Sequence, residues 1–210
     1  MFALSPDAPP ALPFWIDGRA VLSLGERLVD VQNPRQEPVL RRVPVCDAAV
    51  AQRAVAAARA AQPAWAALDP ALRQGVLAAL ATALAGYAPH FARLLGEDAG
   101  LTATAAAEDV ARAEQALLAL PAQAPLSPVC ALLPAVDDPA PFSDAVRRLA
   151  MALNAGSAVL LLSSPCVAAP LLALAELAAR SGVPAGVFNL VHGDAMSARA
   201  LQAAIGDSAG

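Results

Sequence analysis

Apolar and polar residues alternate along the first part of the chain, which is typical of short β-strands. The run 14–21 alternates around the pair Asp17-Gly18, and an Asp-Gly pair between two alternating segments is a strong signal for a two-residue hairpin turn. Two more strand-like runs follow on either side of an Asn-Pro dipeptide, which favours a turn: residues 28–32 and 38–45. The chain is therefore predicted to begin with a small β-structure.

The spacing of the apolar residues then changes to three and four, which indicates amphipathic helices. Asp47 and Asp69 each stand where a helix N-cap is expected, and Pro70 follows in the favoured first helical position. The first helix is predicted over residues 48–61, and Pro63 is expected to end it. The second helix is expected to present one apolar face, formed by Leu72, Val76, Leu77, Leu80, Leu84 and Tyr87.

Two more helices are predicted before the middle of the chain. One begins at Pro89 and ends near Gly100, because glycine suits the residue that follows a helix. The other spans residues 102–120. Its solvated side is expected to carry Glu108, Asp109, Arg112 and Glu114.

From residue 129 onward, short apolar runs alternate with amphipathic segments, which is typical of βαβ units and a parallel sheet. Strands are predicted at 129–133, 158–162 and 187–191, and helices at 143–154, 171–181 and 194–204. We therefore expect an α/β fold with a partial doubly wound, Rossmann-like parallel sheet, preceded by the small β-structure and a group of helices. The predicted organisation is a proline-rich tail (1–13) and one domain (14–210), divided into 14–45, 47–120 and 129–210.

The composition narrows the classes of function. The chain has 14 arginines and no lysine, which excludes a Schiff-base mechanism on lysine. The net charge of −4, without a basic stripe, argues against a nucleic-acid partner. Residues 1–13 lack the basic and apolar regions of a signal peptide, and the run 158–162 is too short to span a membrane. We expect a cytoplasmic protein without membrane contact.

The cysteines and histidines show no pattern of a metal site. Cys46, Cys130 and Cys166 are odd in number and share no metal-ligand spacing, and His90 and His192 are the only histidines. A zinc site and a disulfide framework are therefore not expected.

Several segments resemble, in the same order, the motifs of one enzyme family. Residues 14–18 (FWIDG) resemble the YINGEW opening of aldehyde dehydrogenases, and 31–34 (VQNP) match their V-x-NP turn. The remaining similar segments are 54–65 (AVAAARAAQPAW), 154–160 (NAGSAVL), 175–191 (AELAARSGVPAGVFNLV) and 192–194 (HGD), the last at the position of a TGDG-like turn. The chain is identified as a member of the aldehyde dehydrogenase superfamily and resembles the amino-terminal, cofactor-domain part of these enzymes.

The resemblance implies a cofactor domain for NAD or NADP and an enzyme that forms a thiohemiacetal on a cysteine. The family's KPSE segment, whose lysine and glutamate hold the adenosine ribose, falls on Leu162 to Pro165. Leu162 and Pro165 stand at the two ribose positions, and neither side chain forms such hydrogen bonds. Ser163, Ser164 and Gly193 remain as weak candidates for nucleotide contacts. No cofactor is expected, and NAD or NADP is the group implied if any binding survives.

The resemblance also implies catalytic groups that this chain lacks. The family's PWNFP motif, whose asparagine helps to form the oxyanion hole, falls on 134–142, which holds Asp137 and Asp138 but no asparagine. The segment 121–128 is short where relatives carry part of an oligomerisation flap, so the usual dimer and tetramer are not implied. None of the cysteines lies in a GQxC-like setting, and the family's glutamate base and cysteine-bearing domain are expected beyond residue 210.

Three interpretations of function remain open. The first is a non-catalytic aldehyde-dehydrogenase-like domain, a pseudoenzyme with a structural or protein-interaction role, which self-associates or docks onto a full-length aldehyde dehydrogenase. A sheet of three strands would leave an unpaired edge for such association. The second is the cofactor-domain part of an NAD(P)-dependent aldehyde dehydrogenase that another polypeptide completes. The third is the product of a truncated gene remnant.

Overall fold

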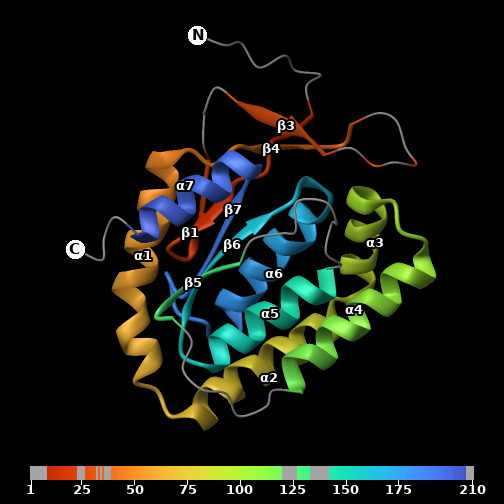
Figure 1. Ribbon diagram of the computed structural model, residues 1–210. Coiled ribbons are helices and arrows are strands. Elements are labelled where there is room, and N and C mark those ends of the chain that lie inside the picture. The colour runs from red at the N-terminus through yellow and green to blue at the C-terminus, as the bar shows by residue number, and fades with distance from the viewer. Residues whose placement is uncertain are drawn as a thin grey trace.

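A computed structural model describes residues 9–22, 27–31, 33, 35, 39–119, 127–132 and 142–206. Its helices and strands form three layers, with the sheet between two groups of helices (Figure 1). The predicted α/β class with a parallel sheet is confirmed.

The three predicted parallel strands form one half of the central sheet. β5 (Val129–Leu132), β6 (Ala158–Ser163) and β7 (Phe188–His192) lie side by side in parallel, with β6 in the middle. β6 and β7 are buried along their whole length. This explains their continuous apolar sequence, because a parallel strand is covered on both faces.

The predicted hairpin is present and extends the sheet. β1 (Phe14–Ile16) and β2 (Arg19–Val21) are antiparallel, and β1 also pairs with β7 through Trp15 and Leu190. The described strand order is β2-β1-β7-β6-β5. The expectation of a three-stranded sheet was therefore wrong, because the hairpin closes the side of β7 that the sequence left unpaired.

Side-chain alternation along the strands divides the core into two clusters, one on each face of the sheet. On one face Ala158, Leu160 and Leu162 pack against α1 (Ala48–Ala66) and α7 (Ala195–Gly206). On the other face Val159 and Leu161 belong to a larger cluster shared with five helices: α2 (Pro70–Gly86), α3 (Ala88–Ala99), α4 (Ala103–Leu118), α5 (Phe142–Asn154) and α6 (Ala168–Arg180).

The other two predicted strands form a separate antiparallel ribbon, β3 (Leu28–Asp30) and β4 (Arg42–Pro44). The ribbon lies beyond the carboxyl ends of β6 and β7 (Figure 1). The Cys46 amide, just after β4, donates to the carbonyl oxygen of His192 at the end of β7. The front end of the chain is thus joined to the sheet at this end.

Two buried side chains join the ends of α1, α2 and α5. Trp65, in the last turn of α1, is 1% exposed, and its indole N–H donates to the Leu153 carbonyl oxygen at 2.9 Å. Arg73, in α2, is 7% exposed. Its guanidinium donates to three carbonyl oxygens at helix ends: those of Asn154 (3.0 Å), Ala66 (3.1 Å) and Leu68 (2.6 Å).

The helix boundaries differ from prediction at Pro63. Asp47 caps α1 as expected, but the helix continues through Pro63 to Ala66. A proline inside a helix removes one backbone hydrogen bond. The burial of Trp65 two residues later offsets this loss, so tertiary packing overrides the local signal.

Three side chains are placed differently from the predicted faces. Leu72 and Tyr87, assigned to the apolar face of α2, are 60% and 51% exposed, while Arg73 between them is buried. Asp109, assigned to the solvated side of α4, is 2% exposed and accepts from the Ser143 hydroxyl at 2.5 Å. The bonds that Arg73 and Asp109 make to neighbouring elements offset part of the cost of burying their polar groups.

Within the described ranges, no single helix meets the length and hydropathy of a membrane span. The consecutive helices α2 and α3 meet them only when taken together across a 74° bend.

Gly186, in the turn before β7, tests the packing of α1 against this turn. Its φ is +80°, and an added Cβ would lie 2.7 Å from the Ala57 carbonyl oxygen in α1. We expect Gly186→Ala to lower the free energy of unfolding in urea by about 2 kcal/mol or more. Gly75→Ala is the matched control, because it lies in α2 with open space around it and should raise stability by about 1 kcal/mol. An equal effect of both changes would contradict the described packing.

Candidate functional site

Ser163 and His192 end the neighbouring strands β6 and β7 and meet in the core. The Ser163 hydroxyl lies 2.6 Å from His192 Nδ1, and His192 Nε2 lies 3.0 Å from the carbonyl oxygen of Pro13. A carbonyl oxygen only accepts, so Nε2 carries the ring proton and Nδ1 accepts from Ser163. The two side chains are 1% and 0% exposed, and they tie the segment before β1 to the sheet.

The electrostatics of this pair exclude a nucleophilic role. Burial lowers the pKa of His192 to about 4, which keeps the ring neutral at pH 7. Phe14 stacks on the ring at a centroid distance of 5.7 Å. Nε2 of His192 faces the backbone carbonyl of Pro13 and not a carboxylate that would orient the ring for catalysis. The Ser163 hydroxyl is also too deeply buried for a substrate to reach it. The pair is an internal hydrogen-bonded link.

The residues next to Ser163, at the expected ribose site, also make contacts within the protein. Leu162 is 3% exposed and packs in the core, and Pro165 begins a short 3₁₀ turn (Pro165–Val167) that leads into α6. The hydroxyl of the half-buried Ser164 lies 3.1 Å from Cys166 Sγ. Leu162 and Pro165 have no polar side-chain atom for a ribose hydroxyl, as their sequence indicated.

Gly193 lies in the turn between β7 and α7, where another side chain fills the space beside it. A Cβ at this position would overlap the side chain of Ser197 in the first turn of α7. The Ser197 hydroxyl donates to the Cys46 carbonyl oxygen at 2.7 Å. Gly193 is therefore needed for the close approach of α7 to the segment after β4, whatever its role toward a nucleotide.

The amino terminus of α7 already carries an acidic cap. One carboxylate oxygen of Asp194 accepts from the amides of Met196 (2.9 Å) and Ser197 (3.2 Å), and the other pairs with Arg27 at 2.9 Å. Burial opposes ionisation, but these amides and Arg27 together hold the Asp194 pKa below its ordinary value. A phosphate at this helix end would meet a negative charge where nucleotide folds present free amides.

These contacts test the fit of NAD or NADP at the carboxyl ends of β6 and β7. Ser163 is buried against His192, Gly193 faces Ser197, and the amides at the start of α7 are bound by Asp194. The described residues do not fit the ribose and phosphates of a dinucleotide at this edge. Whether Ser163, Ser164 or Gly193 contacts a nucleotide stays a prediction.

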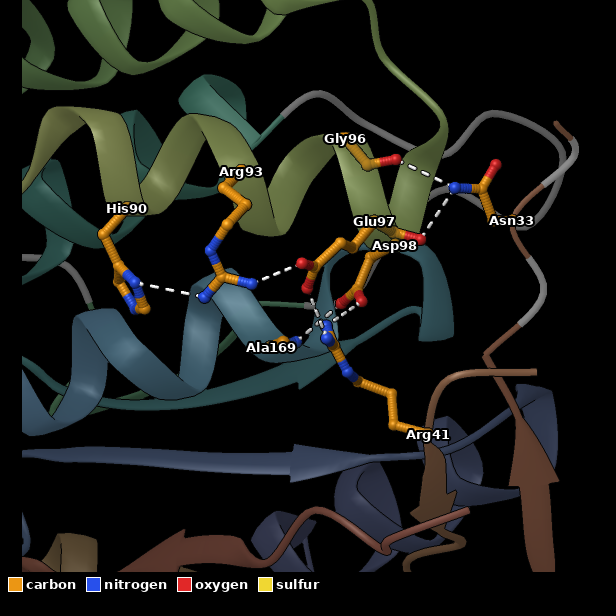
Figure 2. Close-up of polar contacts among 8 residues, drawn as sticks. All are labelled: Asn33, Arg41, His90, Arg93, Gly96, Glu97, Asp98 and Ala169. Carbon is orange, nitrogen blue, oxygen red and sulfur yellow. Dashed lines mark hydrogen bonds and ion pairs between the residues drawn. The ribbon is translucent and has the colours of Figure 1, made fainter. Parts of the chain in front are cut away.

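A polar cluster that the sequence did not reveal joins the ribbon to the helices (Figure 2). Arg41, just before β4, pairs with Glu97 at 2.6 Å and with Asp98 at the end of α3. The other oxygen of Asp98 accepts from the Ala169 amide in the first turn of α6 at 2.9 Å. Two acidic residues at a helix end usually face solvent, so nothing in the sequence separates Asp98 from its neighbour.

More distant groups complete this cluster. Asn33 donates to the carbonyl oxygens of Gly96 and Glu97, while Arg93 pairs with Glu97 and lies 3.3 Å from His90 Nδ1. Burial raises the pKa of Asp98 to about 6, although the Ala169 amide and Arg41 oppose the shift. The ion pairs and hydrogen bonds of this cluster join the segment before β4 to the ends of α3 and α6.

Cys46 and Cys130 lie in surroundings that disfavour the thiolate form. Burial raises the pKa of the Cys46 thiol to about 12, and burial also raises that of Cys130. A reactive cysteine needs a lowered pKa. No three His, Cys, Asp or Glu residues gather into a metal site within the part of the chain that the structure describes. Asp137 and Asp138, of the expected oxyanion segment, lie outside the described residues.

Comparison with known proteins gives the same family along most of the chain. A model described as "Aldehyde dehydrogenase family" matches residues 21–127 and 139–205. Lactaldehyde dehydrogenase of Escherichia coli (strain K12) is 29% identical over 207 residues, covering 88% of this chain and 43% of that one. The mitochondrial methylmalonate-semialdehyde/malonate-semialdehyde dehydrogenase (acylating) of Rattus norvegicus is 29% identical, with coverages of 91% and 39%.

Solved structures agree with this result. The crystal structure of lactaldehyde dehydrogenase from Escherichia coli has a TM-score of 0.82 at 26% identity, covering 92% of this chain and 45% of that one. A putative methylmalonate-semialdehyde dehydrogenase from Sinorhizobium meliloti 1021, complexed with NAD, has a TM-score of 0.84 at 26% identity, with coverages of 92% and 43%. The chain thus spans less than half the length of these relatives.

Two buried groups, His192 and Asp98, have pKa values that are shifted in opposite directions, and together they predict how stability depends on pH. The pKa of His192 is lower in the folded than in the unfolded protein, so its contribution to stability is lost as the pH falls from about 6.5 toward 4. The pKa of Asp98 is raised, so its contribution is present at about pH 4 and is lost as the pH rises through about 6. When the pH falls from about 7 to about 4.5, the free energy of unfolding of Asp98→Asn should therefore decrease by about 2 kcal/mol relative to that of the parent.

His192→Gln is the paired variant. Over the same fall in pH, its free energy of unfolding should increase by about 2 kcal/mol relative to that of the parent. Urea unfolding of both variants and the parent at the two pH values measures these differences. Parallel pH dependences in all three proteins would show that neither group titrates as described.

Proposed function

Because the chain belongs to the aldehyde dehydrogenase family, we propose that it is a non-catalytic domain of that type with a structural or protein-interaction role. The chain matches the family over most of its length but corresponds to less than half of its relatives. On this proposal it does not oxidise aldehydes by itself, and its location is the cytoplasm.

The proposal rests on one observation: the polar side chains at the ends of β6 and β7 form their hydrogen bonds within the protein. In a doubly wound fold, ligands bind outside the carboxyl ends of the strands. In this chain the polar side chains at the ends of β6 and β7 bond to each other and to the segment before β1. The following helix is capped by Asp194. These groups serve the fold and leave the edge without a set of donors for a dinucleotide.

The partners we propose are a second copy of the chain or a full-length aldehyde dehydrogenase. A domain that keeps the fold of an enzyme without its ligand contacts retains surfaces that match the enzyme's other parts. These surfaces, and not a reaction, are then what the chain contributes.

A second candidate function is the cofactor-domain part of an NAD(P)-dependent aldehyde dehydrogenase that another polypeptide completes. The likeness to a structure complexed with NAD favours it, since the backbone follows that fold with a TM-score of 0.84. Leu162 and Pro165, at the expected ribose positions, count against it. Reduction of NAD by a mixture of the chain with its completing polypeptide would support this candidate. A truncated remnant remains the third, and a broad, non-cooperative thermal transition would favour it.

Thermal unfolding with added NAD or NADP tests the proposal. A ligand present at about 100 times its Kd would stabilise the folded state by about 2.7 kcal/mol and raise Tm by several degrees. We expect no change in Tm with either nucleotide, while full-length lactaldehyde dehydrogenase from Escherichia coli serves as the parallel control. A Tm that rises with nucleotide concentration would overturn the proposal and favour the split enzyme.

A further inference from the structure

The ribbon of β3 and β4 is bonded to the segment before β1 and belongs to a sheet separate from the central one (Figure 1). Arg42, the first residue of β4, makes the connection. Its amide donates to the Pro10 carbonyl oxygen at 2.9 Å, and its carbonyl oxygen accepts from the Leu12 amide at 2.8 Å. Its guanidinium also donates to the Pro9 carbonyl oxygen at 3.1 Å. We call the described residues of this unit the strap: 9–12, 27–31 and 39–45.

One end of the strap is joined to the central sheet at the end of β7. The Cys46 amide, directly after the strap, donates to the His192 carbonyl oxygen at 2.8 Å. The His192 ring donates through Nε2 to the carbonyl oxygen of Pro13, which follows the other strap segment. Arg27, where β3 approaches the same end, pairs with Asp194 at 2.9 Å. These bonds leave the opposite end of the ribbon to be held by other contacts.

Little apolar surface holds the strap against the helices. Among the described residues, Val31 and Val43 form a buried cluster with Ala168 at the start of α6, and Leu12 and Val29 pack against it. The clusters on the two faces of the central sheet are several times larger. Regions with few buried apolar contacts open at a lower free energy than that of global unfolding. The strap is therefore expected to be less stable than the sheet.

Polar groups hold the far end of the ribbon (Figure 2). The Arg41 side chain, which is 13% exposed, donates to Glu97 at 2.6 Å and to Asp98, whose side chain is fully buried. Asn33 donates to the carbonyl oxygens of Gly96 and Glu97 at 2.8 and 2.9 Å. All these acceptors lie in the last turn of α3, so this helix end is where the far end of the ribbon is fastened.

Asp98 depends on the strap more than Glu97 does. Glu97 also pairs with Arg93 of its own helix. The second oxygen of Asp98 accepts from the Ala169 backbone amide, which carries no full charge. A buried carboxylate that loses its charged partner is strongly destabilising. The closed position of the strap therefore depends on Arg41, which supplies the charge that compensates the burial of Asp98.

We propose that the strap opens and closes as one unit over the carboxyl end of β6, held closed by the ion pair between Arg41 and Asp98. Opening moves the far end of the ribbon away from α3 and α6. It exposes the start of α6, where Ala168 is fully buried in the closed state. The hydrogen bonds of His192 stay intact, so the central sheet does not unfold. The movement requires neither a nucleotide nor a partner and is therefore independent of the proposed function.

Hydrogen exchange on the whole chain tests the movement. The amides of Leu12, Val31 and Arg42 donate to carbonyl oxygens within the strap. Their protection factors should agree within about threefold, since one opening exposes all three. They should exchange at least about a hundredfold faster, relative to unstructured peptides, than the Val159 amide in the central sheet, which opens only on global unfolding.

Three variants test the ion pair at about pH 7.5, above the Asp98 pKa of about 6. Arg41→Gln leaves the buried carboxylate without a charged partner, so protection of the strap amides should fall at least about tenfold while that of Val159 is unchanged. Adding Asp98→Asn removes the unpaired charge, and this double variant should regain most of the lost protection. Arg93→Gln is the matched control, because Arg93 pairs with Glu97 but lies outside the strap, and it should change nothing.

Equal protection of the strap amides and Val159 in the parent would overturn the proposal, because the strap would then open only with the whole protein. Unequal protection among the three strap amides would show separate fraying and not one unit. An Arg41→Gln variant that loses no protection, or that loses it equally at Val159, would contradict the role of the ion pair. A loss that the double variant does not recover would contradict it as well.

Discussion

The guanidinium of Arg73, which is buried, joins the ends of helices from both sides of the sheet. Arg73 donates to the carbonyl oxygens of Asn154, Ala66 and Leu68, at the ends of α5 and α1 and in the turn before α2. Trp65 adds a fourth bond at the same corner. Just after this corner, Gly156 turns the chain with φ of +87°, and β6 begins two residues later. The start of β6, and therefore the position of Ser163 at its end, follows from how these helix ends are fixed.

At the opposite end of the sheet, the polar groups of the strand ends bond to one another and to the neighbouring segments. His192 and Ser163 fill the strand ends with a neutral hydrogen-bonded pair, and Pro13 accepts the remaining ring proton. Asp194 caps the next helix with a negative charge. Each of these groups is satisfied by the protein itself, which stabilises this end of the sheet.

Much of the fold was predictable because its signals are local. The hairpin turn at Asp17 and Gly18 and the caps at Asp47 and Asp69 depend on a few neighbouring residues, and all are confirmed. The parallel strands were readable from their continuous apolar sequence. The pairing of β1 with β7 was not, because it joins residues that are far apart in the chain and leaves no pattern in either segment.

The errors at single residues have the same origin. Pro63, Arg73 and Asp109 each contradict their local pattern, and each is explained by a partner on another element. Of the candidate site, the lack of polar side-chain atoms at Leu162 and Pro165 could be read from the sequence, since it depends only on residue identity, and the absence of ribose binding stays a prediction. The bond between Ser163 and His192, and the ion pairs of Asp98, arise from the fold and have no sequence signal.

The attachment of the hairpin to β7 also determines the order in which the protein is completed during synthesis. The hairpin is made well before β7, but the Asp17 amide donates to the side chain of Asn189, 172 residues later. Phe14 and Ile16, both fully buried in the folded protein, are not covered by the sheet until β7 has emerged. Closing so long a loop is slow, and the apolar hairpin is exposed to other chains in the meantime. The hairpin thus reaches its place only after β7 has been made, long after its own synthesis.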